Sequence, residues 1–225
     1  MPVRLAIAAA LACLVIWLAM SVLRAARRRT AARAGYFHAI APLFDRTVTR
    51  IEPTGFPRMT GQLGPHAFDL QALPDSLTFR KLPALWIMVS LPEPLPVRAT
   101  LDIMARPNGH EQFSRFAELP VSLPCPAFLP EGTGVRTDDA AHVPGEDLIK
   151  AHAGVFEDPR VKELLVSPKG LRLVLLGDEA ERGRYLIFRD AEVGLDPLSP
   201  DLLSPLLQRL VALRHDLMAQ AKDRP

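Results

Sequence analysis

The side chains able to do chemistry are scattered along this sequence, and few lie close together. Two adjacent carboxylates, Asp138 and Asp139, offer oxygen atoms that can bind a hard cation or transfer protons. Arg172, Arg184 and Arg189 lie on or beside two predicted strands and suit an anionic ligand. Only these five residues support an enzymatic function. We instead expect the acids to cap a helix and the arginines to pair with nearby acids.

Motifs of known enzyme classes are incomplete or missing. The sequence SPKG at 167–170 places a serine near a lysine, but its proline and glycine are typical of a hairpin turn. HE at 110–111 begins like a zinc-protease motif, yet serine stands at position 114, where a second histidine is required. GTG at 132–134 lacks the third glycine of a phosphate-binding loop, so we expect a turn there. No G-x-S-x-G nucleophile elbow occurs in the sequence.

Histidine and cysteine do not cluster as metal ligands do. We expect ordinary surface side chains for the six histidines, which are His38, His66, His110, His142, His152 and His215. Cys13 lies in an apolar segment and Cys125 between two prolines, so no disulfide is expected, and Cys125 is predicted to be a buried structural thiol. The sequence therefore predicts no catalytic, cofactor-binding or metal-binding residue.

The clearest element is an apolar segment near the N-terminus. Leu5–Leu23 contains no charge, proline or glycine. As a helix it spans roughly 28 Å, close to the ~30 Å hydrocarbon core of a bilayer. This predicts a transmembrane signal-anchor of a single-pass membrane protein. The alternatives are a cleaved signal peptide, whose apolar region is usually shorter, and a buried helix of a globular protein.

Charge predicts the orientation of this helix. Residues 1–33 carry no acid and six arginines, five of which follow the apolar segment: Arg24, Arg27, Arg28, Arg29 and Arg33. Because positive residues stay in the cytoplasm, we expect the following domain to be cytoplasmic, at a bacterial inner membrane. These five arginines are predicted to contact the membrane surface, by general attraction to anionic headgroups or by binding a specific lipid.

The rest of the chain differs in charge from this junction. Removing the six arginines from the 27 basic residues leaves 21 Lys and Arg against 25 Asp and Glu. This acidic balance argues against a nucleic-acid partner. We therefore divide the chain into an anchor with its arginine-rich junction, residues 1–33, and one soluble domain, residues 34–225.

The soluble domain has the pattern of an α+β fold with a mainly antiparallel sheet. Alternating residues indicate strands at 67–72 and 98–106, each with one wet face, and the nearly continuous apolar run 85–91 indicates a central strand covered on both faces. Two further strands are expected at 170–177 and 183–191.

Helices are expected at 34–51, within 138–153 and at 159–165. The first packs against the domain or lies on the membrane. Leucines from 202 to 217 predict a final amphipathic helix that covers the sheet or, alternatively, binds another chain. Prolines at alternate positions in 92–96 and 120–130 are predicted to protect sheet edges.

The segment from Lys81 to Pro107 (KLPALWIMVSLPEPLPVRATLDIMARP) and the later VRTDD, FEDPRVKELLVSPKGLRLVLL and GRYLIFRDAEVG resemble bacterial single-pass membrane proteins of uncharacterised function. This resemblance implies an N-terminal anchor followed by a cytoplasmic α+β domain, and implies no activity or cofactor. Together with the missing motifs it favours a membrane-tethered, non-catalytic interaction or scaffold domain. The expected partners are the lipid bilayer and an unknown protein. The alternatives are a membrane-proximal sensor of a ligand or lipid and a membrane-tethered enzyme of unknown reaction.

Overall fold

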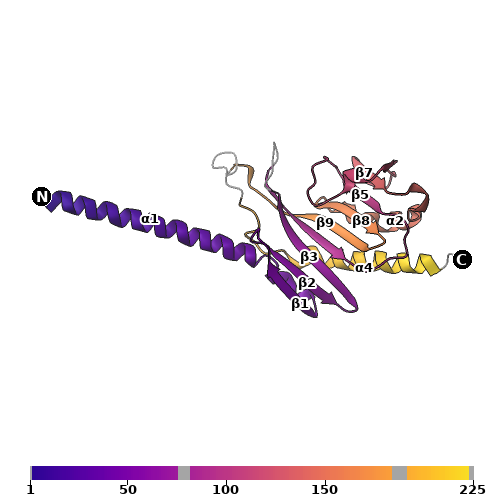
Figure 1. The fold of residues 1–225 in the computed structure, drawn as a ribbon, viewed down its shortest axis with the longest axis horizontal. Coiled ribbons are helices and arrows are strands. Elements are labelled where there is room, and N and C mark those ends of the chain that lie inside the picture. The colour runs from indigo at the N-terminus through magenta and orange to yellow at the C-terminus, as the bar shows by residue number, and fades with distance from the viewer. Residues whose placement is uncertain (1, 76–81, 184–191, 223–225) are drawn as a thin grey trace.

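The computed structural model describes residues 2–75, 82–183 and 192–222. These residues contain a long N-terminal helix, α1 (Pro2–Ala34), a nine-stranded antiparallel sheet, and a C-terminal helix, α4 (Pro200–Lys222) (Figure 1). The predicted α+β class, with an antiparallel sheet and a C-terminal helix, is confirmed.

The sheet has the strand order β1-β2-β3-β4-β9-β8-β5-β7-β6. Neighbouring strands pair antiparallel throughout. The strands are β1 (Arg46–Ile51), β2 (Pro57–Leu63), β3 (His66–Asp75), β4 (Ala84–Leu91), β5 (Leu101–Ala105), β6 (Val121–Leu123), β7 (Thr133–Thr137), β8 (Val161–Ser167) and β9 (Gly170–Glu179). Short helices complete the described part: η1 (His38–Leu43), η2 (Phe116–Glu118), η3 (Ala140–His142), α2 (Glu146–His152) and η4 (Ala153–Glu157).

Helix α1 is long and apolar enough to cross a membrane, judged by length and composition. It does not stop at the end of the apolar segment but continues through the arginines to Ala34. Tyr36, Phe37 and Ile40 follow at once and are buried in the core of the domain. The helix therefore runs into the domain without an intervening linker.

The helix predicted at 34–51 is wrong. After α1 the chain forms the 3-10 helix η1 and then the strand β1. Pro42 lies inside η1 and cannot donate the backbone hydrogen bond that a continuing α-helix requires. Thr47, Val48 and Thr49 are β-branched, which favours the strand that pairs with β2.

The helix predicted at 159–165 is also wrong, because this stretch forms β8. The Asp158 side chain accepts a hydrogen bond from the backbone N–H of Arg160 at 2.9 Å, which makes a turn and not a helix cap. The following residues pair with β9 on one side and β5 on the other. The strand predicted at 170–177 is confirmed as β9, whereas nearly all of 183–191 lies outside the described residues.

The main core lies between α4 and one face of the sheet, which we call the inner face. Leu203, Leu207 and Leu210 of α4 are buried there, as are inward residues such as Ile87 and Leu173. The prediction that the C-terminal helix covers the sheet is confirmed. The opposite, outer face carries the alternate residues of the same strands.

Strand β4 occupies a central position, as predicted, between β3 and β9. Its inward residues, among them Ile87 and Val89, are fully buried. Its outward residues Trp86, Met88 and Ser90 are only half-buried. The expected complete burial of both faces is therefore wrong for the outer face of this strand.

The strand predicted at 98–106 is confirmed as β5, but its predicted wet face is wrong. All five residues of β5 are buried, including Asp102 and Met104 on the outer face. The chain from 107 to 120, here called the crossing segment, runs over this part of the outer face. Its contacts with the sheet place a carboxyl group in the protein interior.

The edge prolines are partly confirmed. Strand β6 is one edge of the sheet, only three residues long, and Pro120 and Pro124 flank it directly. Prolines 92, 94 and 96 lie instead in the connection from β4 to β5, where Leu95 donates its backbone N–H to the Pro168 carbonyl. Prolines 92, 94 and 96 therefore protect no edge strand, whereas Pro120 and Pro124 flank one.

Candidate functional site

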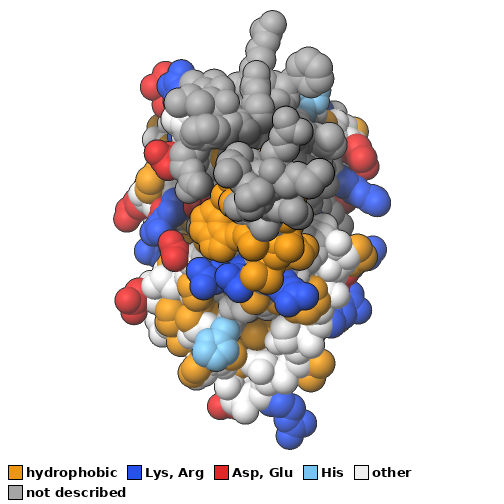
Figure 2. All heavy atoms as spheres, turned by 90° about the vertical axis from the view of Figure 1, so that its left-hand side faces the viewer, with side chains coloured by type: hydrophobic (Ala, Val, Ile, Leu, Met, Phe, Trp, Pro, Cys, Tyr) orange, Lys and Arg blue, Asp and Glu red, His pale blue; other side chains and the backbone are white. Residues whose placement is uncertain are grey.

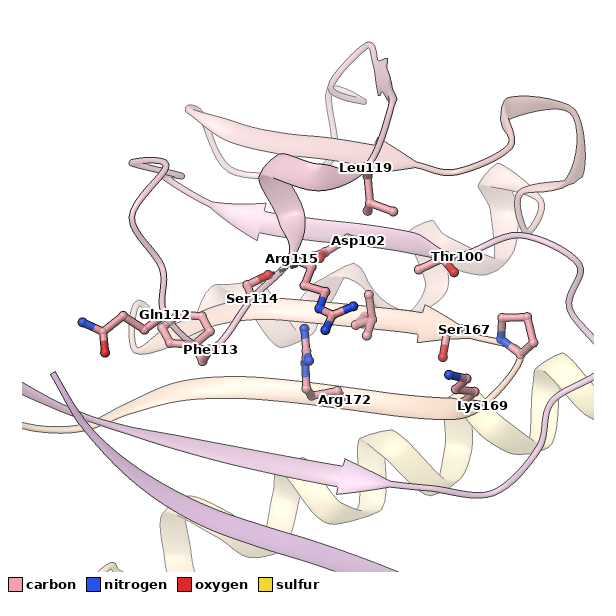
Figure 3. A pocket seen from close by; sticks show the side chains of 12 residues that line it. Thr100, Asp102, Gln112, Phe113, Ser114, Arg115, Leu119, Ser167, Lys169 and Arg172 are labelled. Atoms are coloured by element: carbon pink, nitrogen blue, oxygen red, sulfur yellow. Dashed lines mark hydrogen bonds between the residues drawn. The ribbon is translucent and has the colours of Figure 1, made fainter. Parts of the chain in front are cut away.

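A pocket of about 520 Å³ opens on the outer face of the sheet, opposite α4 (Figure 3). Strands β5, β8 and β9 form its floor, the turn between β8 and β9 closes one end, and the crossing segment forms its roof. The lining residues are Thr100, Asp102, Gln112, Phe113, Ser114, Arg115, Leu119, Leu165, Ser167, Pro168, Lys169 and Arg172. We call this site the outer pocket.

Strand alternation explains why the floor carries polar groups. In the register of the sheet Asp102 lies opposite Leu165, and Leu165 lies opposite Arg172. Directly opposed residues of antiparallel strands point to the same face, so all three project outward. The inward neighbours on each strand fill the core beneath α4.

The crossing segment is fixed to the sheet by a buried lysine. Lys162 donates to the carbonyls of Ala105 at 2.9 Å and Arg106 at 2.6 Å, and pairs with Glu111 at 3.2 Å. Burial alone would raise the pKa of Glu111, but the Asn108 backbone N–H and Lys162 outweigh it and hold this pKa below its usual value. Phe113 packs on Trp86 with ring centroids 5.2 Å apart. These contacts hold the roof of the outer pocket in a defined position on the sheet.

Two carboxyl groups lie side by side at the floor. Asp102 is 1% exposed and Glu163 is fully buried. Arg172 donates to Glu163 at 2.9 Å, and the Ser114 hydroxyl donates to Asp102 at 3.4 Å. One oxygen of each carboxyl, Asp102 Oδ1 and Glu163 Oε1, is buried without a hydrogen-bond partner.

Burial and mutual repulsion decide the protonation state of these two carboxyls. Burial, followed by the charge of Glu163, raises the pKa of Asp102 to about 8, although Arg172 acts in the opposite direction. Burial likewise raises the pKa of Glu163, and Arg172 opposes it. At neutral pH the pair therefore holds one proton, and its single negative charge is matched by Arg172.

The charge of the outer pocket is consequently positive. Figure 3 shows Arg115 and Arg172 extending toward each other across the pocket, with Lys169 at one end. The Arg115 side chain is 87% exposed, and its acidic neighbour Glu118 lies 3.9 Å away. With the carboxyl pair neutralised by one arginine, two cationic side chains remain to receive an anion.

The lining side chains do not form a catalytic arrangement. Among the described residues around the pocket there is no histidine or cysteine to act as base or nucleophile. The Ser167 hydroxyl donates to the Gly170 carbonyl at 3.1 Å, and Ser114 is held by Asp102. Phe113, Leu119 and Leu165 add apolar walls. This combination suits the binding of an organic anion.

The residues singled out from the sequence are not gathered at this site. Asp138 accepts a hydrogen bond from the Thr100 backbone at 2.7 Å, and Asp139 caps η3 by accepting from Ala141 at 2.9 Å. The predicted capping role of Asp139 and the predicted ion pair of Arg172 are confirmed. Arg184 and Arg189 lie outside the described residues. Of the five candidates, only Arg172 belongs to the outer pocket.

The arginines of the junction divide into two groups. Arg24, Arg27 and Arg28 are exposed on α1. Arg29 pairs with Glu192 at 2.8 Å, and Arg33 lies over the Phe56 ring, 5.6 Å from its centroid. Figure 2, which views the molecule from the side of the anchor, shows basic side chains beside apolar ones near the middle of the view. Contact of the five arginines with a membrane surface stays a prediction.

Two predictions about reactive side chains are wrong. Cys125 is exposed and not a buried thiol, because it lies in the proline-rich stretch that leaves the edge strand β6. His66 and His152 are mostly buried, with partners Glu93 at 3.1 Å and Asp216 at 2.9 Å. Within the described residues, no group of three or more His, Cys, Asp or Glu side chains could hold a metal ion.

Comparisons with known protein families, with curated proteins and with solved structures find no match to this chain.

Sequence reasoning missed most of the outer pocket. Asp102 was placed on a wet face, since nothing local shows that a later segment crosses over it. Glu163 lay in a stretch taken for a helix. The hairpin turn predicted at Ser167 and Lys169 is confirmed. The available signal was that this turn directly follows β8, which carries the carboxylate of Glu163. Arg115 lies in a region whose structure the sequence left open.

Proposed function

We propose that this chain is a membrane-tethered, non-catalytic binding domain that receives an anionic group of its ligand in the outer pocket. The observation that carries the proposal is the pairing of a preformed cavity with a surplus of cationic side chains. Arg115 and Lys169 have no buried acid to neutralise, while Arg172 matches the carboxyl pair beneath it. The apolar walls favour an organic anion over a bare inorganic ion.

The two carboxyls support binding and not catalysis. Glu163 is fully buried, so a substrate in the outer pocket does not touch it. Asp102 accepts a hydrogen bond from Ser114, and among the described residues that line the pocket there is no second carboxyl or imidazole across from it. A general acid or base has to lie within reach of the proton that it transfers. The pair therefore supports the floor and sets its charge.

The membrane tether is part of the same proposal. Helix α1 has the length and apolar character required for one crossing, and Arg24, Arg27 and Arg28 follow its apolar part. The excess of arginine on the domain side favours a cytoplasmic domain. We propose that the domain binds its ligand next to the inner surface of the membrane, without involvement of nucleic acid.

Anion binding by the full-length protein in lipid nanodiscs tests the proposal. The probes are phenyl phosphate, benzoate and inorganic phosphate, titrated by calorimetry and by amide chemical shifts. We expect the aromatic anions to bind more tightly than inorganic phosphate, with shifts at Ser114, Ser167 and Arg172.

The double variant R115Q/K169Q removes two exposed charges and leaves the carboxyl pair intact, so we expect at least tenfold weaker binding. The matched control K150Q/R182Q removes two exposed charges elsewhere and is expected to bind within twofold of the wild type. Equal binding by R115Q/K169Q and the control, or no binding of any probe at millimolar concentration, would overturn the proposal. Turnover of an ester or phosphoester in the pocket would replace it with an enzymatic function.

A further inference from the structure

We propose that β1 is a docking edge at which an extended, acidic segment of a different protein adds a strand to the sheet. This interaction surface is separate from the outer pocket and does not depend on it. Strand addition supplies affinity through main-chain hydrogen bonds and specificity through alternate side chains. The proposal therefore has to show which backbone groups of β1 are directed outward, and why another chain pairs with them.

The hydrogen bonds of β1 define its outward side. In the described part of the chain β1 pairs with β2 and lies at the end of the sheet order. Glu52 donates its backbone N–H to the Phe56 carbonyl, which makes this a hydrogen-bonded pair. Pairs alternate along an antiparallel ladder, so even-numbered residues bond to β2. The N–H and C=O groups of Thr47, Thr49 and Ile51 are then directed away from β2.

The two edges of the sheet are built differently. Strand β6 is three residues long and is flanked by Pro120 and Pro124. Strand β1 has six residues, contains no proline, and carries four β-branched residues (Thr47, Val48, Thr49 and Ile51). Proteins commonly shorten edge strands or block them with proline to prevent strand addition. That protection is present at β6 and missing at β1.

Apolar side chains are exposed on this same strand. Val48 is 68% exposed and Ile51 is 53% exposed. Apart from α1, the described residues contain one other large apolar side chain in this class, Leu195 at 37%. Val48 lies on the outer face of β1 and Ile51 on the inner face, so a pairing strand can place an apolar neighbour beside each of them.

Charge indicates the chemistry of the partner. Arg46 and Arg50 share the outer face of β1 with Val48, and opposite charges across a strand pair are favourable, whereas like charges are not. Arg50 also contacts Glu52 at 2.7 Å, so Arg46 is the stronger determinant. A segment that alternates acidic residues on this face with apolar or β-branched residues on the other complements β1.

A second copy of this chain does not fit the same edge. Antiparallel pairing of two β1 strands brings Arg46 and Arg50 of one copy beside the same arginines of the other. Like charges that face each other across a strand pair are destabilising. The occupant is therefore a different chain, with acidic residues at these positions.

Photocrosslinking of the full chain in its native membranes tests this inference. A photoreactive side chain replaces Val48 in one protein and the exposed Lys150 in a control. We expect an adduct with one other protein chain from position 48 and not from position 150. Addition of T49P, which removes an outward N–H without breaking a bond to β2, should reduce the adduct at least tenfold. T49V, which keeps that N–H, should leave it within twofold.

A second variant separates docking from folding. R46E reverses an exposed charge and leaves the backbone unchanged, so loss of an acidic partner is expected without a change in melting temperature. The inference is overturned by an adduct that persists in T49P and R46E, by an adduct to a second copy or to lipid, or by no adduct from position 48. Binding of phenyl phosphate to T49P is expected to stay unchanged. Loss of the adduct in T49P then reports on the β1 edge and not on the outer pocket.

Discussion

The buried pair of Asp102 and Glu163 links the charge of the outer pocket to the stability of the fold. Both carboxyls lie beneath the crossing segment, and among the described residues Arg172 offsets the charge of the pair. An isolated ionised carboxylate is costly to bury, so the protein retains a proton there at neutral pH. Removing that proton leaves two adjacent negative charges beside one arginine.

The pH dependence of unfolding follows from this pair. The pKa of Asp102 is about 8 in the fold and near 3.8 when exposed, so between these values the folded state binds more protons. The stabilisation is complete below about pH 4 and is lost as pH rises through about 8. D102N imitates the protonated form, and we expect its melting temperature at pH 8 to exceed that of the wild type by about 3 °C. At pH 4, where the carboxyl is largely protonated in both states, the two should agree within about 1 °C.

Thermal unfolding of the detergent-solubilised protein from pH 4 to 9 measures this effect. The control is E118Q, which removes an exposed acid near the same pocket and should follow the wild type at every pH. If D102N and the wild type lose stability in parallel with rising pH, Asp102 does not hold the proton.

At the scale of elements, the crossing segment creates the outer pocket, and Lys162 holds it. The lysine satisfies two carbonyls and Glu111 in a site from which water is largely excluded. Removing one member of a buried ion pair leaves the other uncompensated, which costs about 3–5 kcal/mol. We expect K162M to lose that much free energy of unfolding and to weaken phenyl phosphate binding through a loosened roof.

Denaturant unfolding and amide hydrogen exchange measure the two parts of this prediction. Exchange should accelerate in residues 107–119 of K162M and stay unchanged in β2 and β3. The double variant K162M/E111Q removes the stranded charge and should recover part of the lost stability. Unchanged exchange across residues 107–119 would show that other contacts hold the segment.

The same segment shows what the sequence could and could not predict. Periodicity located β3, β4, β5, β9 and α4, because each buries its apolar face within its own local pattern. It failed for β8, where Lys162, Glu163 and two leucines favour a helix locally and pairing with two neighbouring strands decides otherwise. It also failed for the outer face of β5, which is buried by the crossing segment and not by its own local pattern. The outer pocket lies between β8 and the crossing segment, so both wrong predictions concealed it.

At the scale of the whole molecule, the direction of helix α1 in the proposed membrane-tethered arrangement decides which side of the membrane carries the outer pocket. The arginine excess on the domain side favours the cytoplasm. We expect alkaline phosphatase fused at the C-terminus to be inactive and green fluorescent protein at the same position to fluoresce. Fusions to the N-terminus should give the opposite pair of results. An active phosphatase at the C-terminus would place the domain outside.

Helix α1 joins the sheet as one continuous body. Arg29 and Arg33 fasten its last turns to Glu192 and Phe56, and Tyr36 accepts a backbone hydrogen bond from Leu198 just before α4. The eleven residues that follow Leu23, up to Ala34, add about 16 Å of helix at 1.5 Å per residue. In the proposed tethered arrangement no flexible linker separates the domain from the membrane. The domain is held at a fixed distance from the bilayer surface, so a rotation or tilt of α1 rotates or tilts the β1 edge with it.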